Sequence, residues 1–344
     1  RNSVQPLKEQ HPMASVTRTI ESTPSLNYNN LSAHGNLLAL ASKHRVPIVS
    51  AEAESLATLA TINSKDEAMV MQCAWCAFDD TRSYLVLALK TGVQVWSIDG
   101  KRMHLWAPLV TLVAQQVVDT PDSSDLHCMG ITSLVVGGTE CLFIGTSVGA
   151  VLAFHHDRAH STFAMHQALT GPPKEFSPAT ALAGTVGTDG RGRIARADAN
   201  GGLCVWITAD GKSFEPGPSA LASGTCCTGV CIRGNILAST YSTGEIRIHD
   251  AQTGAMRAKV AAHARWINAI ALHPTAWTIA AVSEDTYVSV WSITEAGDAL
   301  TVIPAAYWSV PDAMLCGVAF HGEESKMVTA AAYDSPTLHT WTLP

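Results

Sequence analysis

Four residues in the last third of the chain have the side-chain types of a hydrogen-bonded relay: His263, Ser283, Asp285 and Trp291. Histidine, serine and aspartate together can form a nucleophilic triad, but only where substrate reaches the serine. Here they fall among four predicted β-strands separated by turns. We therefore interpret them as a structural tetrad, with a buried serine that holds strands together. The predicted strands are Lys259–Ala261, Asn268–His273, Thr278–Ser283 and Val288–Ile293.

Cysteines and histidines are the other residues with chemical potential. Cys73 and Cys76 form a CxxC pair, but zinc needs two further ligands at matching spacing. On a strand, positions i and i+3 point to opposite faces, so we expect two separate core cysteines. The odd total of nine cysteines favours free thiols in a reducing compartment. We predict no metal site and no cofactor, and we expect a solvated loop around the clustered histidines His155, His156, His160 and His166.

A recurring pair of strands accounts for most of the chain. The first strand of each pair is apolar and ends in small residues, and the second alternates between apolar and polar residues. We interpret the first strands as inner ones, since small side chains suit a crowded axis. The second strands end about 40–60 residues apart. The seven first strands are Leu37–Ser42, Leu85–Leu89, Leu142–Thr146, Arg193–Ala197, Ile236–Thr240, Ile279–Ser283 and Val328–Ala332.

This period and the tetrad resemble the WD40-repeat family, in which each repeat contributes a four-stranded blade to a β-propeller. The resemblance implies an all-β, seven-bladed WD40 β-propeller. The last repeat has only three strands, and we predict that Val16–Ile20 supplies the fourth and closes the ring. We accordingly divide the chain into an N-terminal arm, residues 1–26, and a propeller, residues 27–344. The loop Ala107–His127 is expected to lie on the surface, without a useful helix.

Composition narrows the classes of partner. The net charge is −7 and the pI about 6.0, which argues against binding along a nucleic-acid backbone. Hydrophobic residues make up 47% of the chain. No apolar run approaches the roughly 18 residues that a membrane span needs, so we expect no membrane insertion. Residue 1 is Arg, and we therefore expect the native N-terminus to lie upstream.

A closer resemblance rests on the last two repeats. AHARWINAIAL followed by SEDTYVSVW, and LCGVAF followed by TAAAYD, are similar to the C-terminal blades of the WD repeat-containing protein 54 family. That resemblance implies a non-enzymatic, intracellular propeller with no catalytic residues. We expect a cytoplasmic scaffold for protein–protein interaction. Two alternatives stay open: a structural component of a larger ciliary, axonemal or cytoskeletal assembly, which would place the protein at a cilium or the cytoskeleton, and an enzyme with its site in the central channel.

One face of the propeller is expected to bind other proteins. The loops that leave the outer strands and the turns after the second strands share this face. Trp266 beside Arg265 has the residue types of an interface hot spot, although packing of Trp266 against its own blade is an equal alternative. The full set of predicted binding residues is Lys90, Arg191, Arg265, Trp266, Tyr287 and Met314.

Overall fold

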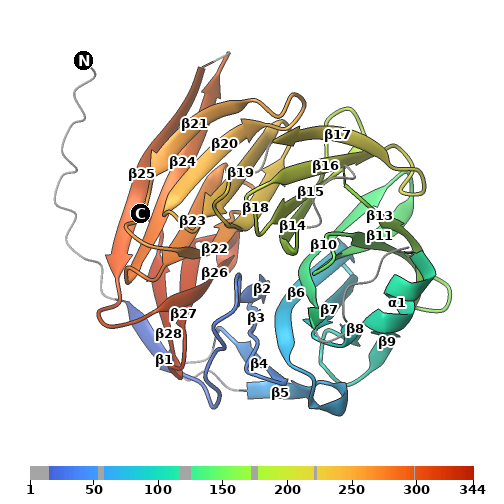
Figure 1. Cartoon of the computed structure of the whole chain (residues 1–344). Coiled ribbons are helices and arrows are strands. Elements are labelled where there is room, and N and C mark those ends of the chain that lie inside the picture. Colours follow the sequence, from blue (N-terminus) through green and yellow to red (C-terminus); the bar gives the residue numbers. More distant parts are fainter. Residues whose placement is uncertain (1–14, 53–57, 117–124, 172–176, 221–222, 298) are drawn as a thin grey trace.

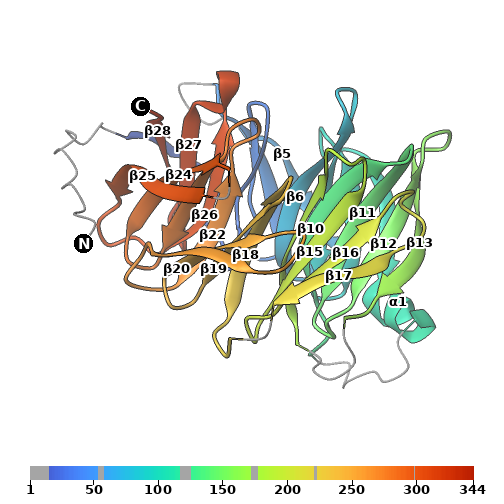
Figure 2. The same ribbon diagram turned by 90° about the horizontal axis from the view of Figure 1, so that it is seen from above.

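The computed structural model describes residues 15–52, 58–116, 125–171, 177–220, 223–297 and 299–344. These residues form seven four-stranded antiparallel sheets, arranged as blades around a central axis (Figure 1). Seen from the side, the blades make a thick disc (Figure 2). The predicted seven-bladed β-propeller is confirmed. Of the predicted N-terminal arm, residues 1–14 lie outside the described residues.

Each blade consists of four strands that follow one another in the chain, except in blade 7. Blade 1 contains β2 (Ser32–His34), β3 (Leu37–Ala39), β4 (Arg45–Ser50) and β5 (Thr58–Asn63). Blade 2 contains β6 (Val70–Asp79), β7 (Arg82–Leu89), β8 (Gly92–Ser97) and β9 (Met103–Pro108). Blade 3 contains β10 (Cys128–Val136), β11 (Thr139–Thr146), β12 (Val151–Asp157) and β13 (Thr162–Leu169).

The second half of the ring repeats this order. Blade 4 contains β14 (Ala179–Val186), β15 (Gly192–Asp198), β16 (Leu203–Thr208) and β17 (Glu215–Ala220). Blade 5 contains β18 (Cys227–Arg233), β19 (Ile236–Tyr241), β20 (Glu245–Asp250) and β21 (Met256–Ala261). Blade 6 contains β22 (Ile267–Leu272), β23 (Thr278–Ser283), β24 (Tyr287–Ala296) and β25 (Ala299–Ser309). The four strands predicted between residues 259 and 293 therefore belong to two blades, because β21 is the outer strand of blade 5.

Blade 7 is completed from the other end of the chain. It contains β26 (Leu315–His321), β27 (Met327–Ala332), β28 (Thr337–Thr342) and, as its outer strand, β1 (Val16–Thr19). The pairing of β1 with β28 is antiparallel and sets Val16 opposite Thr340. An N-terminal strand thus closes the ring, as predicted, and covers an edge that would otherwise be open.

The apolar Ala-rich runs are the second strands of the blades rather than the innermost ones. The first strand of each blade packs against the first strand of the next blade, nearest the axis. Second strands carry small residues because they pack against the neighbouring blade. In blade 6, for example, Ala280 and Val282 on β23 pack with blade 7. Close approach of two flat blades needs small side chains as much as crowding at the axis does.

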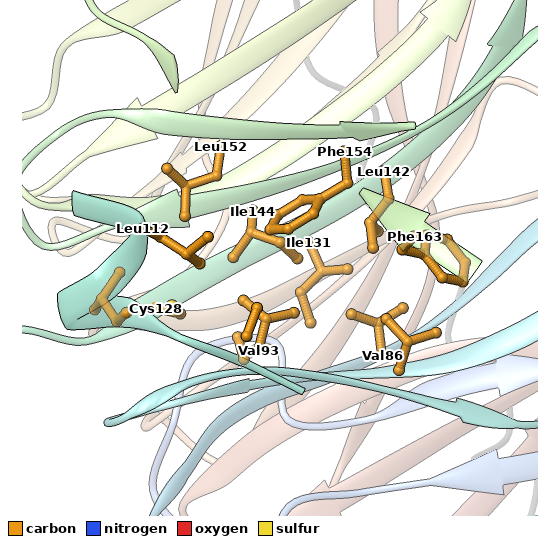
Figure 3. Packing of buried hydrophobic residues seen from close by; sticks show 14 of the residues in the cluster. Val86, Val93, Leu112, Cys128, Ile131, Leu142, Ile144, Leu152, Phe154 and Phe163 are labelled. Carbon is orange, nitrogen blue, oxygen red and sulfur yellow. The ribbon is translucent and has the colours of Figure 1, made fainter. Parts of the chain in front are cut away.

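Apolar side chains fill the wedges between neighbouring blades. Between blades 2 and 3, side chains from β7, β8, β10, β11, β12 and β13 interdigitate (Figure 3). The helix α1 (Leu109–Gln116) closes one end of this wedge, with Leu109, Leu112 and Val113 buried. The expectation of a surface loop from Ala107 was therefore wrong for this stretch, because the i, i+3, i+4 spacing of those three residues gives a helix an apolar face. None of the helices within the described residues has the length and apolar character that crossing a lipid bilayer requires.

Candidate functional site

The antiparallel blades define two faces of the disc. The turns between second and third strands, and the connections from one blade to the next, lie on one face, which we call the upper face. The turns between first and second strands and between third and fourth strands lie on the lower face. This follows from strand direction alone, since successive strands run in opposite directions.

Five of the six predicted binding residues lie on the upper face. Lys90 is in the turn between β7 and β8, and Tyr287 begins β24. Arg265 and Trp266 lie between blades 5 and 6, and Met314 lies between blades 6 and 7. All five have exposed side chains.

Arg191 is the exception. It lies between β14 and β15, the first and second strands of blade 4, and therefore on the lower face. Its Nη2 atom is 2.8 Å from Oε2 of Glu215, at the start of β17 on the same face. The prediction was wrong because it took the turn before the apolar run of β15 for the connection between blades. A first strand, β14, precedes that turn.

Trp266 does not pack only against its own blade. Its ring stacks on Tyr28, with centroids 6.4 Å apart and planes inclined by 21°. Tyr28 belongs to the segment that runs inward from β1, the outermost strand, to β2, beside the axis. Burial raises the pKa of Tyr28, with Cys226 and then Glu284 adding to the effect. The aromatic pair thus joins the N-terminal segment to blade 6.

Asparagines of this N-terminal segment tie several blades together at the axis. The Asn29 side chain donates to the carbonyl of Thr228 in blade 5 at 3.2 Å and accepts from the N–H of Ile270 in blade 6 at 3.1 Å. The Asn30 backbone N–H donates to the carbonyl of Cys316 in blade 7 at 3.0 Å. On the other side of the ring, Asn27 donates from Nδ2 to the carbonyl of Val70 in blade 2 at 2.9 Å, so the segment spans the upper mouth of the channel. Sequence analysis missed these residues; the available signal was a run of short amides, a type that readily bonds backbone groups.

Beside this crossing segment lies a cavity of about 290 Å³. Residues from both sides of the channel mouth line it. Met71 on β6 and Met129 on β10 form one side, and Trp266 with Asn268 the other. The remaining lining residues are Leu26, Asn27, Tyr28 and Glu284. This cavity is a candidate binding site on the upper face.

The predicted tetrad is assembled around a different serine. The Nδ1 atom of His263 lies 3.1 Å from both Asp285 oxygens, and its Nε2 atom lies 2.7 Å from Oγ of Ser289. Trp291 donates from Nε1 to the same oxygen at 3.0 Å. Ser283 lies at the edge of this group, where its Oγ accepts the Asp285 backbone N–H at 3.2 Å. The structure thus places Ser289 where sequence analysis placed Ser283.

Burial and hydrogen bonding act in opposite directions on Asp285. Burial raises the pKa of this carboxyl group, but hydrogen bonds from His263 and from the Ala264 N–H lower it, and the result is a pKa of about 2. Because a carboxylate only accepts, Nδ1 of His263 carries a proton, and in the neutral ring Nε2 accepts the Ser289 hydroxyl. The side chain of His263 is fully buried and that of Ser289 also lies in the core, so this relay holds strands together, out of reach of substrate.

Three of the clustered histidines lie on β12 and β13, and His160 lies in the turn between these strands. His156 is buried between blades 2 and 3, where its Nδ1 is 2.5 Å from Oε2 of Glu140 and its Nε2 is 3.0 Å from the Tyr84 hydroxyl. His155 stacks on His166 at 4.2 Å, and His160 lies 2.7 Å from Asp157. The expectation holds for His160, which is exposed in the turn, and was wrong for His156, because its side of β12 faces the wedge between blades.

The CxxC cysteines are both buried free thiols. Burial raises the pKa of Cys73 and of Cys76 to about 12. All nine cysteines are free, and seven of them are buried. Within the described ranges, no three His, Cys, Asp or Glu side chains come together as metal ligands would.

Comparison with known proteins places this propeller in a family. A sequence model of the WDR54 family matches residues 29–342, from the crossing segment to the last strand. The chain belongs to the WDR54 family. It is 28% identical over 271 residues to mouse WD repeat-containing protein 54, covering 77% of this chain and 76% of that protein. The human protein of the same name is 26% identical over 268 residues, with the same coverage.

A solved propeller supports the fold. A chain in the crystal structure of the mitotic checkpoint complex superposes with a TM-score of 0.70, covering 100% of this chain and 96% of that one. Its sequence is 18% identical, so the likeness concerns the fold alone. The predicted resemblance to WD repeat-containing protein 54 is confirmed.

Proposed function

We propose that this WDR54-family protein is a non-enzymatic scaffold for protein–protein interaction and binds partners through its upper face. One observation carries the proposal: large apolar side chains on the upper-face loops are between 37% and 51% exposed. Aromatic residues and methionine are enriched at protein interfaces, and five of the six residues concerned are of these types. These residues are Leu26, Met69, Trp266, Tyr287, Met314 and Tyr333.

Two features support a role without catalysis. An enzyme site in the central channel would need access from a face, and the crossing segment spans the upper mouth through Asn29 and Asn30. The relay that resembles a nucleophilic triad has its serine, Ser289, in the core. Both features favour a propeller that binds at its surface over one that reacts at its axis.

The compartment and the class of partner follow from the same chemistry. Nine free thiols favour the reducing cytoplasm, and the net charge of −7 disfavours nucleic acid as a partner. Membership of a ciliary, axonemal or cytoskeletal assembly is the narrower alternative within this proposal. Imaging of the tagged protein tests it: enrichment at a cilium or on filaments supports the narrower role, and a diffuse signal contradicts it.

Affinity capture tests the proposal. The bait is compared with a Tyr287→Ala/Met314→Ala variant of the upper face and with a control variant, Ile98→Ala/Met256→Ala. The control removes side chains of similar exposure from the lower face and the outer rim. We expect proteins captured by the wild type to be retained by the control and lost from the upper-face variant. Equal capture by all three folded baits would refute the proposal.

A further inference from the structure

The cavity at the channel mouth has an unusual combination of lining groups. Two aromatic residues, Trp266 and Tyr28, and two thioethers, Met71 and Met129, make up half of its eight lining residues. Aromatic faces attract cations, and polarisable thioethers pack against many shapes of side chain. None of the eight lining residues is Lys, Arg or His, whereas one of them, Glu284, is acidic. The cavity wall therefore attracts a positively charged group, and none of its own residues is a cation that would compete with that group.

Glu284 has no partner for its charge. Its backbone N–H donates to the Trp266 carbonyl at 3.0 Å, which fixes the residue at the cavity edge. Its side chain is half-buried, and within the described residues its carboxylate makes neither a hydrogen bond nor an ion pair. The carboxylate keeps contact with water at the cavity edge and carries a negative charge that no described cation neutralises. A cationic guest would pair with it.

The amides of the cavity wall add acceptors. Asn27 donates from Nδ2 to the Val70 carbonyl at 2.9 Å, and Asn268 donates from Nδ2 to the Leu315 carbonyl at 2.8 Å. In each case the donor side of the amide is used within the protein. Among the described contacts, the Oδ1 atom of each amide receives no donor, so both oxygens remain able to accept. A guest that carries several N–H donors on a positive charge fits this wall best.

We propose that this cavity binds the side chain of a lysine or arginine in an exposed segment of a partner protein. The inference rests on the proposed scaffold function and assigns the chemistry of the partner. The Glu284 carboxylate pairs with the ammonium or guanidinium group, and the aromatic residues Trp266 and Tyr28 lie beside it in the cavity wall. A purely apolar side chain would leave Glu284 uncompensated, and an acidic one would be repelled.

Methyl NMR on the full chain provides the test. The methionine methyl groups are labelled with ¹³C, so that Met71 and Met129 report from the cavity wall and Met314 reports from the same face outside it. The probes are capped pentapeptides, Gly-Gly-X-Gly-Gly, in which X is arginine, lysine, glutamine, leucine or glutamate. We expect saturable shifts of the two cavity methyls with the arginine or lysine peptide and at least tenfold weaker binding of the other three.

Variants separate charge from folding. Glu284→Gln keeps the shape of the side chain and should weaken binding of the basic peptide about tenfold or more. The matched control is Asp312→Asn, which removes a carboxylate from the same face outside the cavity, at a positive φ that asparagine tolerates. It should leave the affinity unchanged. The proposal is overturned if no peptide shifts Met71 and Met129, if leucine binds as tightly as arginine, or if the two variants behave alike.

The outcome is distinguishable from failure of the scaffold function. In one outcome, affinity capture still depends on Tyr287 and Met314, but Glu284→Gln changes neither peptide binding nor capture. That outcome supports the scaffold function and refutes the proposed pocket for a basic residue. In the other outcome, capture does not depend on the upper face, but the basic peptides bind the cavity in the titration. That outcome supports the pocket as a binding site and refutes the scaffold proposal.

Discussion

Replacing the relay serine tests the hydrogen-bond geometry of blade 6. In Ser289→Ala the buried hydroxyl is lost, so Nε1–H of Trp291 loses its acceptor at 3.0 Å and Nε2 of His263 loses its partner at 2.7 Å. Both rings are held inside the blade, and the cavity left by one hydroxyl is too small for a replacement water. In Ser283→Ala only one contact is lost, the Asp285 N–H to Oγ bond of 3.2 Å.

The expected magnitudes follow from the number of groups left unpaired. A buried donor or acceptor without a partner costs about 1–3 kcal/mol. With two such groups, Ser289→Ala should lower the free energy of unfolding by about 2–6 kcal/mol. With one backbone donor near a turn, Ser283→Ala should lower it by about 1 kcal/mol. The difference in unfolding free energy between Ser289→Ala and Ser283→Ala therefore decides which serine belongs to the relay.

Urea unfolding measures this difference. Tryptophan fluorescence and far-ultraviolet circular dichroism should be followed together, since coincident transitions justify a single free energy for a domain of this size. Ser292→Ala, on the same strand, is the control: Ser292 is half-buried and makes no side-chain hydrogen bond within the described residues, so its removal should change little. If Ser283→Ala costs as much as Ser289→Ala, the assignment of the relay serine is refuted.

Three further predictions use the same structure. The pKa of Asp285 is about 2, below its usual 3.8, so its stabilisation is complete above about pH 4 and is lost as pH falls toward 2. The difference in unfolding free energy between wild type and Asp285→Asn should shrink by about 2 kcal/mol across that window, and a constant difference would contradict this. Asn29→Ala removes two contacts between blades and should lower urea stability by about 1–3 kcal/mol, unlike Asn36→Ala at the surface. In the native protein, mass spectrometry after brief alkylation should find half-buried Cys226 modified before buried Cys73.

The fold could be predicted because its signals are local. Strand alternation and turn residues recur along the chain, and the shortage of one strand in the last repeat pointed to Val16–Ile20 as the closing strand. The choice between serines was not local. On β24, Ser289 stands two residues before Trp291 and so shares its face, which is a usable signal. His263 lies on the loop before β22. How far its side chain extends into the blade decides that its Nε2 atom contacts Ser289 rather than Ser283.

Arg191 and the crossing segment show two other limits of local pattern. The face on which a turn lies depends on which two strands of the blade the turn joins. Because β14, before Arg191, was not recognised as a strand, this turn was assigned to the wrong face. The asparagines of the crossing segment bond to backbone groups about 200 residues or more away along the chain, such as Thr228 and Ile270. No periodicity records such contacts, because the backbone N–H and C=O groups that they meet are common to every sequence with this fold.

Closure of the ring and formation of the binding cavity depend on the same short stretch of chain. β1 completes blade 7 at the rim, and the residues that follow it run inward until Asn29 and Asn30 are bonded to inner strands. Between these two anchor points lie Leu26 and Tyr28, which form one wall of the cavity. A propeller without β1 would leave an open edge on β28 and would hold that wall at one end only. The geometry of the upper face is therefore a consequence of how the ring is closed.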